Sequence, residues 1–366
     1  ENEFLKFYLL NLILKFRINF SSSTELEQFI TTLGLANIVS NSEKDKIQYI
    51  SEEKFLLLQQ QLKHKTIRFY KYFLNLHFTT QYSLLSLITQ KRLNILSFDE
   101  NIVKYLSLLS CEDQDKAALV LDEMNKNTTL TQDILNTSLL ESFKKNYSDY
   151  VQNKELNTIN EDREHLTITR TIEVTPSMIF YVAPKFERTN HLLRKYSDYK
   201  ENFLKMNIFD EDKNKLYFSS FAAMKLSKFI SELMHEGLYI GSRYFQFISS
   251  SNSQMKNCSF WLVNLEGTKF EKRENIIMEL GDFTEEKNIY KNAARRGQCL
   301  SSTTFITMLN KEKIIEIDDI KRNGFIFTDG IGQISPELSI KCATVMKYKQ
   351  NFSSAYQIRL GGVKGV

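Results

Sequence analysis

The chain has 366 residues, of which 42% are hydrophobic and 25% charged, and its formal net charge is +4. This is the composition of a soluble globular protein with room for two or three domains, and the charge permits a nucleic-acid partner without arguing for one. The four cysteines form no Cys-x-x-Cys pair and the five histidines are scattered, so no zinc site is visible. We expect reduced, buried cysteines in an intracellular protein of the nucleus or the cytoplasm.

The first apolar segment, Phe4 to Phe16, contains Lys6 and Lys15 and is too short to span a bilayer. A buried helix is the better interpretation, and no membrane partner is expected. The sequence has no initiator Met and no cleavage site of the secretory type, and it stops directly after a motif. We therefore expect a segment of a longer protein.

Residues 1–165 are predicted to be mostly helical, because Gly34 is the only glycine before Gly237 and no proline precedes Pro176. A capping box begins at Thr24, and an amphipathic stretch follows Ser51. Further helices are predicted at 80–90, 99–109, 113–125 and 131–145. The polar run 146–164 is interpreted as a linker.

The pattern changes after residue 165. Strict alternation over 166–174 predicts a half-buried strand, and the apolar run 178–182 predicts a second one. Residues 219–236 have one apolar helical face and are followed by a β-hairpin that turns at Gly241-Ser242. Near the C-terminal end we predict a strand at 325–328, a glycine turn, a helix capped by Ser335, and a strand at 356–360.

In the last predicted strand, apolar residues alternate with Gln357 and Arg359. Gly361-Gly362 then allows a tight bend, and Lys364 lies just past it. Cations held on a strand and a glycine turn suit phosphate, because glycine lets the backbone approach it closely. The alternative is an ordinary hairpin end with solvated charges.

Two segments near the end read Asp329-Gly330-Ile331-Gly332-Gln333-Ile334-Ser335 and Gln357-Ile358-Arg359-Leu360-Gly361-Gly362-Val363-Lys364-Gly365. Together with upstream blocks at 175–211, 253–261 and 292–302, they resemble the eukaryotic, cell-encoded RNA-dependent RNA polymerases of RNA silencing. The five blocks follow the family's order, whereas residues 1–165 carry no part of the resemblance.

Some positions depart from the family's pattern. Ala183, Lys185 and His191 differ from the residues usual in the first block. Lys256 replaces an Arg, so that a point charge stands where a planar fork is usual.

Other positions allow two interpretations. Arg295 and Arg296 point to different faces of a helix and either contact nucleic-acid phosphate or lie in solvent. Asp329 is either a metal ligand or a turn former. Trp261 and the many Phe and Tyr residues are expected in the core rather than as base-stacking platforms.

The resemblance implies an α+β fold in which two double-psi β-barrels face each other. The expected division is a helical region at 1–165, a mixed α/β slab-like domain at 166–300 and the start of the first barrel at 301–366. The family's Asp-x-Asp-Gly-Asp loop, which holds Mg²⁺, is absent from this sequence and is expected beyond Val366.

The implied activity is RNA-directed RNA synthesis, which makes double-stranded RNA from single-stranded templates and ribonucleoside triphosphates with Mg²⁺. Lys364 and Arg359 would contact the nucleotide's phosphates or the RNA backbone in the catalytic site. The residues that would hold RNA are Arg295, Arg296, Gln298 and Lys256. The turn residues of the motifs are Asp329, Gly330, Gly332, Gln357, Gly361 and Gly362.

Candidate protein partners belong to the Dicer-type nuclease, Argonaute-pathway and nucleotidyltransferase classes. A non-catalytic RNA-binding scaffold derived from the same fold is the main alternative. A helical interaction module is a third, and it describes residues 1–165 better than the rest.

Overall fold

The structure is a computed structural model. It describes residues 68–90, 92–93, 98–113, 115–126, 139–156, 166–176, 178–217, 221–281, 283–328, 330–347, 353, 355–360 and 364–365. The helices predicted at Phe4 to Phe16, after Thr24 and after Ser51 lie outside these residues. One compact unit contains Arg170–Pro184 and Phe209–Phe245 with the helices that precede them, and the other contains Lys185–Ile208 and Gln246–Val366. The predicted division at residues 165 and 300 stays a prediction.

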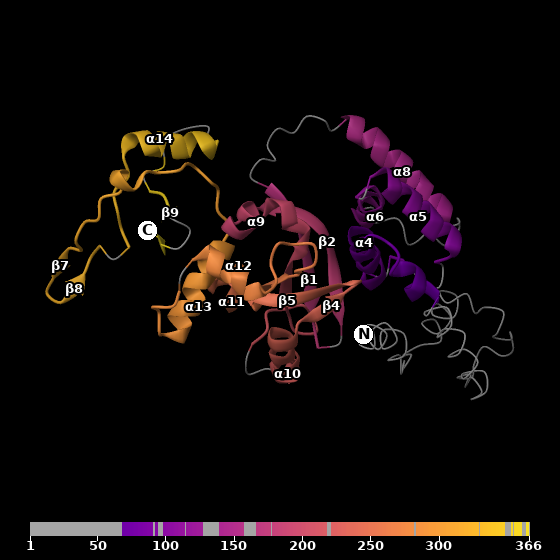
Figure 1. Cartoon of the computed structure of the whole chain (residues 1–366), viewed down its shortest axis with the longest axis horizontal. Coiled ribbons are helices and arrows are strands. Elements are labelled where there is room, and N and C mark those ends of the chain that lie inside the picture. Colours follow the sequence, from indigo (N-terminus) through magenta and orange to yellow (C-terminus); the bar gives the residue numbers. More distant parts are fainter. Residues whose placement is uncertain are drawn as a thin grey trace, which may run out of the picture. The chain divides into compact units, whose positions relative to one another are not determined.

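The described part of the chain mixes helices with a six-stranded sheet (Figure 1), which confirms the expected α+β class. The helices that precede the sheet are α4 (Phe78–Thr89), α5 (Glu100–Glu112), α6 (Lys116–Lys126) and α8 (Leu139–Leu156). Three of them confirm the helices predicted at 80–90, 99–109 and 113–125. Asp99 begins α5 as an N-cap, since its carboxylate accepts a hydrogen bond from the Ile102 amide at 3.0 Å.

Helix α8 corrects the predicted linker, because it continues to Leu156 through the first part of the run 146–164. Its inner face packs against α5 and α6 and buries Phe143 completely. Asn146 is also buried and donates a hydrogen bond to the Ser142 carbonyl at 2.8 Å. The Lys116 ammonium lies 4.9 Å from the centroid of the Tyr147 ring. The first part of this run is helical, so its polar composition alone was misleading.

The sheet has the strand order β2-β1-β3-β6-β5-β4. Pairing is antiparallel between β3 and β6, between β5 and β6, and between β4 and β5. The predicted strands at 166–174 and 178–182 are confirmed, although the second continues to Arg188. The strand bounds are β1 Leu166–Val174, β2 Ile179–Arg188, β3 Phe203–Ile208, β4 Leu238–Ile240, β5 Arg243–Ser249 and β6 Ser259–Val263.

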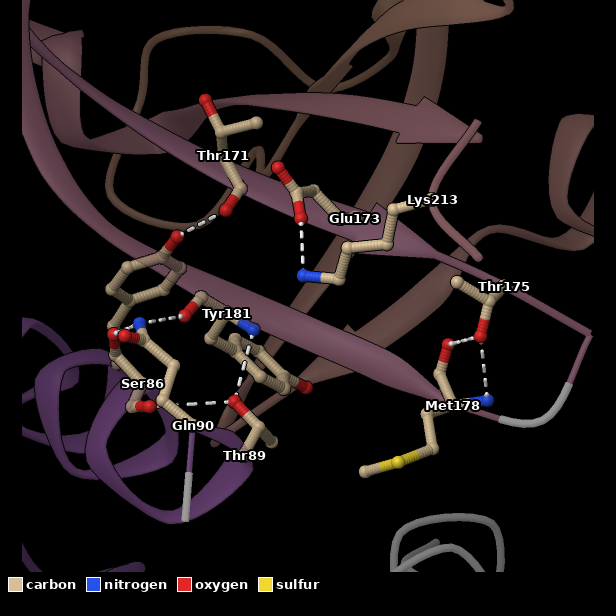
Figure 2. A network of polar contacts seen from close by, with 10 residues as sticks. Ser86, Thr89, Gln90, Thr171, Glu173, Thr175, Met178, Tyr181 and Lys213 are labelled. Atoms are coloured by element: carbon tan, nitrogen blue, oxygen red, sulfur yellow. Dashed lines mark hydrogen bonds and ion pairs between the residues drawn. The ribbon is translucent and has the colours of Figure 1, made fainter. Parts of the chain in front are cut away.

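Helix α4 is completely buried and binds the backbone of β1 and β2 through polar side chains (Figure 2). The Tyr82 hydroxyl lies 2.7 Å from the Thr171 carbonyl and 2.9 Å from the Val182 carbonyl. The Tyr181 amide donates to the Thr89 hydroxyl, and the Gln90 amide group donates to the Tyr181 carbonyl, each at 3.1 Å. These contacts tie α4 to the backbone of both strands.

Helix α10 (Phe221–Glu236) and the hairpin of β4 and β5 confirm the order predicted from 219 onwards. Gly241 has a φ of +58° in the hairpin turn. A Cβ at this position would lie 2.3 Å from the Gln81 Oε1 atom, which itself accepts a hydrogen bond from the Ser242 amide at 2.7 Å. Glycine therefore serves both the turn conformation and the close approach of α4.

A second core lies under α9 (His191–Lys195), η3 (Ser197–Asn202) and α12 (Arg273–Leu280). It contains Trp261, which is 4% exposed, together with Cys299 and Leu300. The expectation that the single Trp is a core residue is confirmed. Cys258 and Cys342 are also buried, as expected. Cys111 on α5 is exposed, so the expectation that all four thiols are buried was wrong. All four cysteines are free thiols.

The C-terminal part contains η5 (Lys311–Lys313), β7 (Lys321–Arg322), β8 (Phe325–Ile326), α14 (Pro336–Val345), β9 (Arg359–Leu360) and β10 (Lys364–Gly365). The Ser335 hydroxyl caps α14 as predicted and accepts from the Leu338 amide at 3.2 Å. The strands predicted at 325–328 and 356–360 are shorter than expected, because each pairs over only two residues. In the part of the chain that the structure describes, no helix combines the length and the apolar character needed to cross a membrane.

Candidate nucleic-acid interface

Helix α13 (Ile289–Gly297) carries the two arginines for which RNA contact was predicted. The Asn288 side chain caps its first turn by accepting from the Lys291 amide at 3.1 Å. At its last residue a Cβ on Gly297 would lie 1.9 Å from the Ser250 carbonyl oxygen. Only glycine lets the backbone approach this closely, so the end of α13 is fixed against the segment that follows β5.

Arg295 and Arg296 both lie on the exposed side of α13, in its last turn. The Arg295 guanidinium pairs with the Glu286 carboxylate at 3.0 Å, which offsets its charge. The Arg296 guanidinium lies 5.9 Å from the centroid of the Phe283 ring. A guanidinium over a ring face keeps its edge available for a phosphate, so Arg296 is the better placed of the two.

The short helix η4 (Gln298–Leu300) follows α13 directly. The buried Gln298 Oε1 atom has no hydrogen-bond donor among the described residues. The Cys299 thiol donates to the Arg296 carbonyl at 3.0 Å. Burial raises the pKa of this thiol to about 11, and the positive charge of Arg359 acts in the opposite direction.

Lys256 is exposed in the last turn of α11 (Asn252–Lys256). Ser251 and Gln254 form a capping box that begins this helix. The Gln254 amide group also donates to the Leu300 carbonyl at 3.4 Å, which ties α11 to η4. Lys256 therefore belongs to the same group of elements as Gln298.

The hairpin of β9 and β10 carries the two cations of the last motif. Leu360 pairs with Lys364, and Arg359 pairs with Gly365 in an antiparallel register. The backbone of Lys364 is thereby placed in a strand, whereas its side chain and both Gly361 and Gly362 lie outside what the structure describes.

Of the other predicted motif residues, the structure describes Gly330, Gly332 and Gln357. Asp329 lies outside the described residues, so its role stays a prediction. Gly330 has a φ of +69°, as a glycine turn requires. Gly332 and Gln357 are exposed.

Sequence reasoning missed the role of Arg194 in α9, although it matched this residue to a family block. The Arg194 guanidinium forms a fork on Thr303, with Nη1 2.5 Å from the carbonyl oxygen and Nη2 2.8 Å from the hydroxyl. The two residues are 109 positions apart, so no local spacing could have paired them. The alternation and capping rules detect only near neighbours.

The described site is cationic and holds no metal-binding group. In the residues covered by the structure, no three His, Cys, Asp or Glu side chains gather where they could hold a metal ion. The donor set of Arg296, Gln298, Lys256 and Arg359 suits anionic oxygens and hydroxyl groups rather than Mg²⁺, which prefers carboxylates.

Known proteins provide an independent comparison. A family model described as RNA dependent RNA polymerase matches residues 174–366, which is more than half of the chain. One relative, from Oryza sativa subsp. japonica, carries the name "Probable RNA-dependent RNA polymerase SHL2" and is 33% identical over 221 residues, which cover 56% of this chain and 18% of the relative.

RNA-dependent RNA polymerase 1 of Arabidopsis thaliana is 32% identical over 208 residues, or 53% of this chain and 18% of that protein. RNA-dependent RNA polymerase 1 of Schizosaccharomyces pombe is 32% identical over 200 residues, or 54% of this chain and 16% of that protein. The chain thus spans less than a fifth of the length of these relatives. By its match over 174–366, which contains every predicted site residue, the chain belongs to the RNA-dependent RNA polymerase family.

Proposed function

We propose that the complete protein is an RNA-directed RNA polymerase that makes double-stranded RNA on single-stranded templates in RNA silencing. The observation that carries this proposal is the family match over 174–366, which includes the hairpin with Arg359 and Lys364. The relatives described above bear the name RNA-dependent RNA polymerase.

The reaction is the attack of an RNA 3′-hydroxyl on the α-phosphate of a ribonucleoside triphosphate, with pyrophosphate as the leaving group. Mg²⁺ would supply activation of the hydroxyl and stabilisation of the leaving group. The described residues do not fit a Mg²⁺ site, so the ion would need carboxylates other than theirs. Residues of this chain contribute position and positive charge, which phosphoryl transfer requires most.

Arg359 and Lys364 would supply that charge to the nucleotide's phosphates or to the RNA backbone. Arg296, Gln298 and Lys256 would hold the template by its phosphates and 2′-hydroxyl groups. Since single-stranded RNA is then gripped through its backbone, we expect little sequence preference. Arg295 contributes less, because Glu286 already pairs with it.

We further propose that residues 301–366 begin the first of two double-psi β-barrels. Its support is the exposure of large apolar side chains in this segment, including Met308 at 83% and Ile315 at 81%. Apolar side chains exposed in this number are expected to be covered by further protein. Protein partners of the Dicer, Argonaute and nucleotidyltransferase classes stay predictions.

The test is nucleotide incorporation by the complete protein on a single-stranded RNA template, with and without Mg²⁺. The proposal expects Mg²⁺-dependent conversion of the template into a product that resists single-strand-specific nuclease. RNA binding without any incorporation would instead favour the non-catalytic scaffold, and the polymerase function would be wrong.

A further inference from the structure

The Arg194–Thr303 contact is a two-pronged hydrogen bond from a half-buried guanidinium. One nitrogen donates to the Thr303 carbonyl at 2.5 Å and the other to its hydroxyl at 2.8 Å. A planar guanidinium can make both bonds at once, whereas an ammonium is a point donor. Two of the five N–H donors of Arg194 are therefore engaged with Thr303 inside the protein.

Three more contacts fix the same stretch of chain at the beginning of α9. The Thr303 amide donates to the Thr189 carbonyl at 3.0 Å. The Asn190 side chain donates to the Leu300 carbonyl at 3.4 Å, and Asn190 forms an antiparallel bridge with Ser302. Residues 300–303 are therefore held at one place by backbone and side-chain contacts together.

A series of polar contacts leads from this place to the cationic hairpin. The Lys341 ammonium on α14 donates to the Thr307 hydroxyl at 2.7 Å, four residues after Thr303. The Tyr356 hydroxyl donates to the Ser339 carbonyl on the same helix at 3.3 Å, and Arg359 follows three residues later. Because residues 303–328 include no buried residue, these few polar contacts carry much of the segment's position.

The positive charge of Arg359 also acts to lower the pKa of the Cys299 thiol, which directly precedes the segment 300–303 that α9 holds.

We propose that the Arg194–Thr303 fork is a positioning latch: Arg194 does not contact RNA but fixes the segment that places Arg359 in the RNA site. The proposal rests on the proposed function for Arg359. Arg194 would then affect RNA binding only indirectly, and Thr303, which is uncharged, would be needed for the same effect.

The test compares RNA affinity of the complete protein and its variants for a single-stranded oligonucleotide, with amide exchange of residues 300–310 measured without RNA. Arg194→Lys keeps the charge but loses the fork, and Thr303→Val removes the hydroxyl while keeping the shape. We expect each to weaken RNA binding about tenfold, the scale of a lost hydrogen bond to a charged group, and to speed amide exchange. Thr303→Ser and Arg188→Lys, the second at an exposed arginine of β2, should behave as wild type.

Placing Thr303→Val in an Arg359→Ala background separates the explanations. The latch predicts no further loss of affinity there, because the residue that it positions is gone. Weaker binding by Arg194→Lys with unchanged binding by Thr303→Val would mean that Arg194 contacts RNA itself and would overturn the latch. Equal losses from Thr303→Val in both backgrounds would also overturn it.

The failure of the proposed function has a different signature. If Arg359→Ala binds RNA as wild type does, the RNA site is wrong. In that case amide exchange of residues 300–310 still tests whether the Arg194–Thr303 contact fixes this segment. Unchanged exchange in Arg194→Lys would overturn the latch, and faster exchange would show that the contact holds the segment in place.

Discussion

Helix α4 is held on its strands by buried contacts, whereas residues 303–328 are held by a few polar contacts and expose most of their large apolar side chains. All residues of α4 are buried. Its side chains form hydrogen bonds with the backbone of β1 and β2 (Figure 2). In the segment 303–328 no residue is buried, and Ile317 is 73% exposed. The first region is stabilised by the hydrophobic effect and the second depends on individual polar contacts.

Substitutions in the two regions should therefore have different effects, on stability in the first and on RNA binding and nucleotide addition in the second. Changes in the buried region should lower the free energy of unfolding of its own compact unit. Changes in the C-terminal segment, which is residue 303 and the residues after it, should alter RNA binding and nucleotide addition with little effect on global stability.

The largest effect is expected for Lys364→Ala in the complete protein. If Lys364 stabilises charge on the transferring phosphates, its removal should lower the rate of nucleotide addition by about 10²–10³-fold. Single-turnover incorporation measures the rate, and circular dichroism should show an unchanged fold. Lys321→Ala on the exposed hairpin of β7 is the matched control. Normal extension by Lys364→Ala would show that this lysine has no catalytic role.

Gly297→Ala should be the most destabilising of the single changes outside the hairpin. Alanine normally favours a helix over glycine, but here the new Cβ would meet the Ser250 carbonyl at 1.9 Å. We expect a loss of about 2–3 kcal/mol in the free energy of unfolding, together with weaker RNA binding. Denaturant titration checks the first.

A matched glycine sharpens this prediction. Gly267 has a φ of +72° and open space around its Cβ position, so Gly267→Ala should cost only about 1–2 kcal/mol of backbone strain. A Gly297→Ala protein that is more stable than wild type would show that α13 does not contact Ser250 as described.

Tyr82→Phe tests the buried region. The substitution keeps the ring but leaves the Thr171 and Val182 carbonyls without this donor. We expect a loss of about 1–1.5 kcal/mol, read from the denaturant midpoint, because a hydrogen bond inside the protein is lost. RNA binding should not change. Tyr217→Phe, at a 67% exposed tyrosine, should leave the midpoint where it is.

Ser335→Ala tests the C-terminal segment at a position away from the cations. Loss of the cap on α14 should cost about 1 kcal/mol locally and speed amide exchange in the first turn of that helix. The global denaturant midpoint should stay the same, in contrast with Tyr82→Phe. Ser335→Asp should keep the slow exchange of the wild type, since aspartate also caps a helix. A shifted global midpoint in Ser335→Ala would contradict the expectation that this segment contributes little to global stability.

Sequence patterns predicted the parts of the fold that depend on near neighbours. Alternation gave the bounds of β1, and Ser335 with Pro336 gave the start of α14. The extension of α8 beyond residue 145 was missed, because its polar residues have the composition of a linker. Pairing of Arg194 with Thr303 is a long-range contact that no local rule contains.

For the candidate site, residue types were more predictable than their arrangement. The cations and the glycine turns follow from the motifs. That Arg295 pairs with Glu286 while the charge of Arg359 acts on the pKa of the Cys299 thiol depends on tertiary packing.

The central claim is that Arg359 contacts the RNA backbone, and salt-dependent RNA binding tests it most directly. The complete protein, Arg359→Ala and the exposed control Arg322→Ala would be titrated against one single-stranded RNA at several salt concentrations. We predict that Arg359→Ala alone binds about tenfold more weakly and reduces the salt slope by about 0.7, the value for one lost phosphate contact on a single strand. An affinity and a slope equal to those of Arg322→Ala would contradict the claim.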